Sequence, residues 1–257
     1  MGITFISAVL PVFVILYFIY RKDKNQPEPT GKLIKTFFAG CLSILPAALM
    51  ESGLSLFAPD ASQVPVMNGV YTGFAVAGFC EELCKLLLLL LVVWRSQYFD
   101  EYFDGIVYAV YLSMGFACVE NVMYVFGNED AMSVALARGV LAVPAHFLFA
   151  VTMGYYVSLA KFDPQHKLKH LSLALIYPVL LHGTYDSLLM VSENISTAYG
   201  EEDTVVTVVC MVLFVLFIVF DIMLWKWGVK RIKKMQQRSK EQDFNPLNPF
   251  ENFTWNV

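Results

Sequence analysis

Long apolar runs separated by short polar segments occupy most of the chain. A helix that crosses a membrane needs roughly 20 mostly apolar residues. The pattern predicts seven such spans, at residues 3–20, 33–57, 67–94, 103–126, 139–160, 171–191 and 204–225. A helix satisfies its own backbone hydrogen bonds in lipid, so helices are the expected spanning elements. The sequence therefore predicts an all-α polytopic membrane bundle.

The composition agrees with this interpretation. Hydrophobic residues make up 57% of the chain and charged residues 16%, and the mean hydropathy is +0.57. Soluble domains are nearer 45–50% apolar and about 25% charged. There is no basic excess, which argues against nucleic-acid binding. The first span lacks a basic leader and is followed by Arg21 and Lys22, so we expect a retained span and no cleaved signal peptide.

The loop charges alternate and predict an orientation. Basic residues follow the first, third, fifth and seventh spans, and acidic residues follow the second, fourth and sixth. The acidic loops contain no lysine and one arginine, Arg138. Lysine and arginine accumulate on the cytoplasmic side. We therefore expect the N-terminus outside and the C-terminus in the cytoplasm.

The chain divides into two parts by composition. Residues 1–228 form one predicted transmembrane domain, with a motif-bearing core at 77–189. Residues 229–257 form a basic segment and a tail rich in Asn, Pro and Phe. A basic, mildly amphipathic segment is expected to lie along an anionic membrane surface.

Ionisable side chains inside the spans are the candidates for chemistry. Such a residue costs a few kcal/mol or more in lipid and marks function by default. These spans contain Glu51, Glu81, Glu82, Lys85, Glu120, His146, His182 and Asp186, with Asn121 beside Glu120. At 1.5 Å per residue, Glu81 and Glu82 lie about 20 Å below the outer boundary, and the later residues lie further outward. We infer one polar cavity open to the extracytoplasmic side. Glu51 matches no motif and is expected to be structural or part of a cavity wall.

The sequence "FCEELCK" places two glutamates and a lysine on one helix. Glu81 is four residues before Lys85 and Glu82 is three before it, so both can reach Lys85. The structural interpretation is an ion pair that fixes helix packing. We expect Lys85 to pair with Glu81 and to leave Glu82 free to activate water, although the two glutamates could exchange these roles.

Two carboxylates and two histidines around a wet cavity are the parts of a hydrolase. A glutamate beside His146 can deprotonate a water molecule, and His182 can help to stabilise an oxyanion. Alternatively, His146 and His182 with Glu82 or Glu120 can ligate Zn²⁺, which lowers the pKa of a bound water. The residues alone do not choose between these mechanisms.

Four ordered motifs resemble one known family. "EELCK", "FDGIVYAVYLSMGFACVENVMYV", "PAHFLFAVTMGYYVSLAKF" and "HGTYDSLL" lie in successive predicted spans. They resemble the PrsW intramembrane proteases, distant relatives of the CAAX prenyl proteases and the abortive-infection membrane proteins. The motif residues fall on Glu81, Glu82, Glu120, Asn121, His146 and His182.

The resemblance implies an intramembrane endopeptidase of the bacterial plasma membrane, of glutamic or metal-dependent type. It implies site-1-type cleavage of a single-span membrane protein such as an anti-sigma factor, near its extracytoplasmic side. The catalytic residues would be Glu81, Glu82, His146 and His182, with Lys85, Glu120, Asn121 and Asp186 in support. The wider superfamily has Asn four residues after the last histidine, where this chain has Asp186, so we expect Asp186 to orient His182.

Three other interpretations are weighed against a glutamate-histidine protease. A proton-coupled transporter could use the same buried acids and histidines as a relay, but it usually contains an internal repeat, and none is evident here. A non-catalytic scaffold would need only the ion pairs. A thiol of Cys80, Cys84 or Cys118 could pair with a histidine, but the acidic surroundings disfavour a thiolate.

Overall fold

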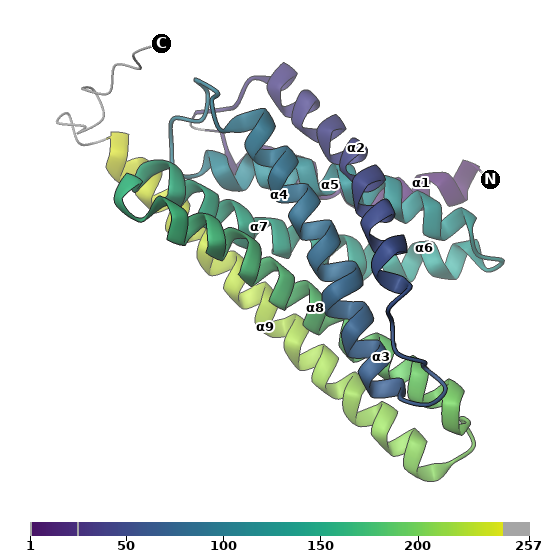
Figure 1. The fold of residues 1–257 in the computed structure, drawn as a ribbon. Coiled ribbons are helices and arrows are strands. Elements are labelled where there is room, and N and C mark those ends of the chain that lie inside the picture. Colours follow the sequence, from purple (N-terminus) through teal and green to yellow (C-terminus); the bar gives the residue numbers. More distant parts are fainter. Residues whose placement is uncertain (1, 25, 244–257) are drawn as a thin grey trace.

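A computed structural model describes residues 2–24 and 26–243. Over those residues the chain forms helices and no strand, which confirms the all-α prediction. The elements are α1 Gly2–Lys22, α2 Thr30–Ser55, α3 Pro65–Tyr71, η1 Thr72–Gly78, α4 Phe79–Val93, α5 Asp104–Phe126, α6 Ala131–Val140, α7 Ala142–Phe162, η2 Pro164–His166, α8 Lys167–Tyr199 and α9 Thr204–Asp243 (Figure 1).

Within the described residues, six helical segments are long and apolar enough to cross a membrane. The prediction was seven. The difference lies at residues 67–94, where α3, the π-helical segment η1 and α4 form one continuous rod (Figure 1). The predicted span is helical throughout, but a seven-residue π-helix separates its two α-helical parts. A π-helical turn inside a helix frequently accompanies a functional site.

One helix was not predicted. The segment before the fifth predicted span folds as α6, whose first turn is capped by the Asp130 side chain accepting from the Ser133 backbone N–H. The chain bends at Leu141 and continues as α7. This bend brings α6 back against α1 and α5.

The core of the bundle is formed by the middle of the chain. In the most apolar window of α5, 67% of the residues are buried, against 22% in α1 and 11% in α9. The large exposed apolar side chains of α1, α2 and α9 therefore suit contact with lipid. At the crossing of α2 and α5, a Cβ on Gly115 would collide with the Phe37 carbonyl oxygen, so a small residue is required there.

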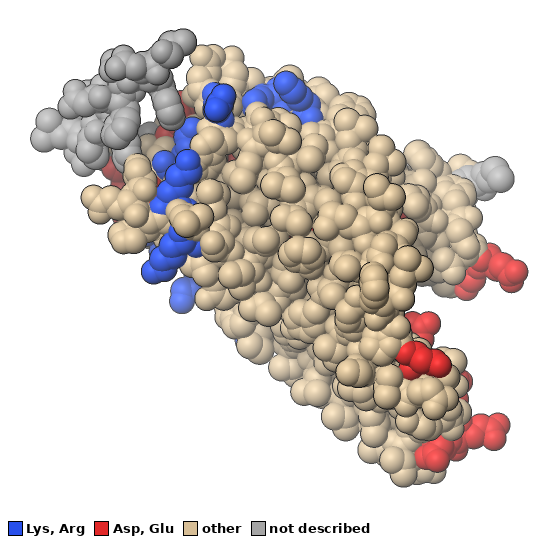
Figure 2. Space-filling view, viewed as in Figure 1, with Lys and Arg blue, Asp and Glu red and all other residues tan. Residues whose placement is uncertain are grey.

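The charges separate along the molecule. Most of the visible Lys and Arg side chains lie at the end where α9 ends, and most of the visible Asp and Glu lie at the opposite end (Figure 2). This separation agrees with the predicted orientation. α9 has 40 residues, or about 60 Å at 1.5 Å per residue, so the basic segment continues the last span as a helix. Residues 244–257 of the predicted tail lie outside the described part of the chain.

Candidate active site

Four of the predicted catalytic side chains converge inside the bundle. Glu81 and Glu82 come from α4, His146 from α7 and His182 from α8. All four are buried, and each offers a ligand atom within 4.8 Å of those of the others. The sequence separates the first and last of these residues by about a hundred positions, so the fold assembles the group.

The π-helical segment η1 leads directly into the glutamates. It packs closely against α8: a Cβ on Gly73 would lie 2.8 Å from the Ser187 backbone nitrogen and 3.0 Å from the Gly183 carbonyl oxygen. Only glycine permits this approach. The contact holds the start of α4 against the helix that carries His182.

Lys85 lies at the centre of the group. Its Nζ is 2.9 Å from Glu81 Oε2, 2.8 Å from Glu82 Oε1 and 3.2 Å from His146 Nδ1. It also lies 4.1 Å from the Phe116 ring centroid. The expectation that Lys85 would pair with Glu81 alone is therefore wrong. An ammonium group has three hydrogens, and the i+3 and i+4 spacings bring both glutamates within reach.

The two histidines take different carboxylate partners. His182 Nδ1 is 3.0 Å from Glu82 Oε1, whereas His146 Nε2 is 2.8 Å from Glu120 Oε2. Glu82, expected to activate water together with His146, instead contacts His182, and the carboxylate on His146 is Glu120. The rings of His146 and His182 are perpendicular, with centroids 5.4 Å apart.

The hydrogen bonds assign the protons of these rings. The Lys85 ammonium can only donate, so His146 Nδ1 accepts and His146 Nε2 donates to Glu120. His182 has Glu82 on Nδ1 and Asp186 Oδ2 at 3.2 Å from Nε2. Both contacts are satisfied when both nitrogens carry hydrogen, which makes His182 a cation.

The supporting residues lie around this group. Asp186 contacts His182, as its expected orienting role requires. Among the described residues, Asn121 hydrogen-bonds to neighbours outside the four central residues: its Nδ2 donates to the Ala8 carbonyl oxygen at 2.6 Å. It ties α5 to α1.

Arg138 is a site residue that the motifs did not reveal. Its Nη2 is 2.9 Å from Glu120 Oε2, its Nε donates to Asn121 Oδ1 at 2.9 Å, and its guanidinium lies 3.9 Å from the Tyr124 ring centroid. One sequence signal could have found it, because Arg138 is the single basic residue in the predicted outer loops.

Exposure indicates the side from which the site is reached. The side chain of Glu82 is 1% exposed, that of Glu120 15% and that of Asp186 21%. The site is therefore more open toward Glu120 and Asp186 than toward Glu82. The depths predicted from the sequence also place Glu120 and Asp186 nearer the outer boundary of the membrane than Glu82.

The central residues fit a metal ion by donor type. Two imidazoles with a carboxylate form a common catalytic zinc set, and Glu81, Glu82, His146 and His182 can present their ligand atoms together. The Lys85 ammonium already contacts three of these four side chains. Glu120 is the other carboxylate considered for such a set. It contacts Nε2 of His146, whereas Lys85 contacts Nδ1 of the same ring.

The cysteines form no pair with either histidine among the described contacts. Cys80 Sγ lies 3.5 Å from the Ala75 carbonyl oxygen, and Cys84 Sγ lies 3.8 Å from Met50 Sδ. These contacts are typical of packed thiols.

A polytopic helical bundle with a buried glutamate-histidine group is the architecture of an intramembrane hydrolase. A model of the PrsW family of intramembrane metalloproteases matches residues 28–219. The chain is 33% identical over 251 residues to a protein named Protease PrsW from Clostridioides difficile strain 630, covering 95% of both chains. It is 33% identical to the protein of the same name from Bacillus subtilis strain 168, over 73% of this chain and 83% of that one.

The chain belongs to the PrsW family. A relative from Oceanobacillus iheyensis, also named Protease PrsW, is 35% identical over 71% of this chain and 81% of its own length. No solved structure matches the chain significantly. The protein is a multi-pass membrane endopeptidase of the bacterial cell membrane, which favours the protease over the transporter and scaffold interpretations.

Proposed function

We propose that this protein cleaves a single-span membrane protein by water activated at Glu81, in a site reached from the extracytoplasmic side. The observation that carries the proposal is the convergence of Glu81, Glu82, His146 and His182 within 4.8 Å of one another. Such a concentration of polar groups inside a membrane bundle indicates chemistry more than packing.

The contacts favour Glu81 over Glu82 as the base. Glu82 Oε1 contacts both Lys85 and His182, and its side chain is 1% exposed. Glu81 hydrogen-bonds to Lys85, its nearest contact with His182 is 4.0 Å, and its side chain is 7% exposed. Glu81 is therefore the carboxylate better placed to receive a water molecule. The sequence had placed Glu82 first in that role.

The hydrolysis then follows from the positions of the side chains. Glu81 accepts a proton from the water as the water oxygen attacks the carbonyl carbon of the peptide bond. The cationic His182 keeps its Nδ1–H on Glu82 and donates its Nε2–H to the negative oxygen of the tetrahedral intermediate in place of Asp186. The C–N bond breaks as Glu81 returns the proton to the amide nitrogen.

A bound metal ion would take over from Glu81 the activation of the water molecule. It would be held by His146 and His182 with Glu81 or Glu82, and when bound it lowers the pKa of a water molecule and polarises a carbonyl. In that case His146 would exchange its contact with Lys85 for the metal. The remaining carboxylate and Lys85 would orient the ligands.

An anti-sigma factor with one transmembrane helix is the proposed substrate class. The support is family membership together with the greater exposure of the site toward Glu120 and Asp186. A substrate that unwinds near the outer leaflet would present its peptide bonds on that side.

The test is cleavage of a single-span anti-sigma factor by the purified protein in detergent or nanodiscs. We expect Glu81→Gln and His182→Ala each to lower kcat/KM by at least about 100-fold. Asp221→Asn is the matched control, since Asp221 is an intramembrane carboxylate on α9 that is not among the four central residues. Full cleavage by a folded Glu81→Gln variant would reject Glu81 as the base.

Metal dependence is read from the same reaction. Dialysis against a chelator, followed by return of Zn²⁺, separates the two mechanisms. Loss and recovery of cleavage support the metal, and unchanged cleavage after measured metal removal supports the glutamate alone.

A further inference from the structure

A second group of carboxylates lies at the opposite end of the bundle from the acidic loops. Asp23 follows α1, Glu101 precedes α5, and Asp104 is the first residue of α5. Each can present an oxygen within 4.8 Å of the others. They are 3%, 7% and 0% exposed. Acids with so little exposure are uncommon unless they are paired or bind a cation.

One oxygen of each aspartate has a structural role. Asp104 Oδ2 accepts from the Asp100 and Glu101 backbone N–H groups at 3.0 and 2.7 Å. Asp23 Oδ2 accepts from the Glu28 N–H at 3.1 Å. These bonds shape the loops but leave the second oxygen of each carboxylate for another partner.

Those second oxygens are buried without a hydrogen bond. Asp23 Oδ1 and Asp104 Oδ1 accept no hydrogen bond from a donor among the described residues, and the buried Glu28 carboxyl group lies within hydrogen-bond reach of the Asp104 side chain. Leaving a buried polar atom unsatisfied is costly, so such an atom calls for an explanation.

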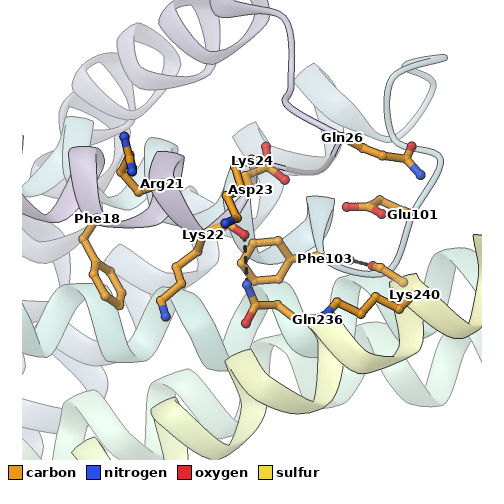
Figure 3. Close-up of a pocket in the computed structure, with 11 residues that line it drawn as sticks. Phe18, Arg21, Lys22, Asp23, Lys24, Gln26, Glu101, Phe103, Gln236 and Lys240 are labelled. Carbon is orange, nitrogen blue, oxygen red and sulfur yellow. Dashed lines mark hydrogen bonds between the residues drawn. The ribbon is translucent and has the colours of Figure 1, made fainter.

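The nearby lysines have other contacts. Lys32 Nζ donates to the Val92 carbonyl oxygen at 2.7 Å, and Lys161 Nζ donates to the Trp94 carbonyl oxygen at 2.8 Å. Lys161 is also attracted electrostatically by Asp104. Beside the carboxylates is a cavity of about 410 Å³ that Asp23 and Glu101 help to line. In Figure 3, Arg21 and Lys22 lie on the other side of this cavity from Glu101.

We propose that Asp23, Glu101 and Asp104 form a binding site for Mg²⁺ at the cytoplasmic end of the bundle. Carboxylate oxygens are the ligands of hard divalent cations. Mg²⁺ is typically held by one or two carboxylates and keeps several waters, which the adjoining cavity can hold. The site lacks the imidazoles of the intramembrane group, so it favours a hard cation where that group favours Zn²⁺.

This position gives the ion a structural effect. The three carboxylates come from the α1–α2 loop, the α4–α5 loop and α5. Two bonds drawn in Figure 3 attach α9 to the same place: Gln236 Nε2 donates to the Lys22 carbonyl oxygen, and the Phe103 N–H donates to Ser239 Oγ. Bound Mg²⁺ would therefore join the cytoplasmic ends of α1 and α5 where α9 packs.

The test uses the full chain, treated with chelator and held in nanodiscs. Mn²⁺ is the probe, because free Mn²⁺ is measured by electron paramagnetic resonance and Mg²⁺ competes for the same ligands. We expect one Mn²⁺ to bind to the wild type and to be displaced by Mg²⁺, and Asp23→Asn and Asp104→Asn each to weaken it at least about tenfold. Mg²⁺ should also raise the thermal unfolding midpoint of the wild type alone.

Two controls separate this site from its surroundings. Glu241→Gln removes an exposed carboxylate of α9 that accepts from Gln237, and it should bind Mn²⁺ as the wild type does. His146→Ala removes an intramembrane donor and should also retain the ion. If Asp104→Asn fails to fold, Asp23→Asn and Glu101→Gln decide the result.

Two outcomes would overturn the proposal. One is a folded wild type that binds no Mn²⁺, which would mean that the carboxyl groups are satisfied by protons. The other is unchanged affinity in the Asp23→Asn and Glu101→Gln variants, which would place the bound ion elsewhere.

Discussion

Lys85 determines the electrostatics of the site, because one ammonium contacts two glutamates and a histidine. Its side chain is 1% exposed, so water cannot replace it. Removing one partner of a buried ion pair leaves an uncompensated charge and typically destabilises by about 3–5 kcal/mol. The role of Lys85 is thus to make two adjacent glutamates compatible with the bundle interior.

We expect Lys85→Met to lower the free energy of unfolding by about 3–5 kcal/mol, because Glu81 and Glu82 lose their shared cation. Thermal unfolding of the purified variant measures the change. The triple variant with Glu81→Gln and Glu82→Gln removes the charges that Lys85 neutralises, so it should recover part of the loss. No recovery would mean that Lys85 acts through packing alone.

We expect Arg138→Gln to lower kcat/KM by about 10- to 100-fold, since Glu120 loses the guanidinium that helps to hold it on His146. Single-turnover cleavage measures this. Arg138→Lys should recover little, because one ammonium cannot reproduce the separate contacts of Nη2 and Nε.

The matched control for this variant is Arg95→Gln, an exposed arginine at the basic end of the bundle. Equal activity in Arg138→Gln and Arg95→Gln would contradict a positioning role for Arg138.

At the scale of elements, η1 and α8 form the contact on which the catalytic geometry depends. We expect Gly73→Ala to move η1 away from α8, because its Cβ would meet backbone atoms of Ser187 and Gly183. The free energy of unfolding should fall by about 1–3 kcal/mol. Cleavage should also fall, since the Glu82–His182 contact crosses the same interface.

Gly53→Ala tests whether the effect of Gly73→Ala comes from this contact. A Cβ on Gly53 has nothing within 4 Å, and alanine favours a helix more than glycine does. We therefore expect unchanged or slightly higher stability in a thermal unfolding experiment. Similar losses in both variants would contradict the importance of the η1–α8 contact.

The elements that the sequence predicted best are those with strong apolar periodicity and clear ends. The α5 helix begins within a residue of the predicted span, at Asp104. The π-helix was missed because its residues are as apolar as those of an α-helix. The hydropathy pattern therefore does not distinguish the two kinds of helix. The α6 helix was missed because its ten residues are too few to cross a membrane, although most of them are apolar.

At the scale of the site, the motifs predicted which residues meet but not how they pair. The i+3 and i+4 spacing allows both glutamates to reach Lys85. The prediction of a Glu81–Lys85 pair alone therefore left out the Glu82–Lys85 contact. Which histidine faces which carboxylate depends on helix rotation, which one sequence does not specify. Arg138 was missed as a site residue because its partners lie in another helix.

At the scale of the whole molecule, the charge separation in Figure 2 predicts a fixed orientation in the bilayer. A cysteine introduced by Asn128→Cys should react with an impermeant thiol reagent in intact cells, and one introduced by Gln97→Cys only after permeabilisation. Both positions are exposed. The unsubstituted chain, measured in parallel, gives the background from its five native cysteines. The reverse pattern would invert the predicted topology.

The pairing of Lys85 with two glutamates of its own helix also bears on how the chain enters the membrane during synthesis. α4 leaves the ribosome well before α7 and α8, so His146 and His182 cannot yet help it. Because both partners of Lys85 lie within one turn of it, the helix brings its own counter-charge to the translocon. A mutation that left the finished site intact but broke this local pairing would act at insertion, before any catalysis begins.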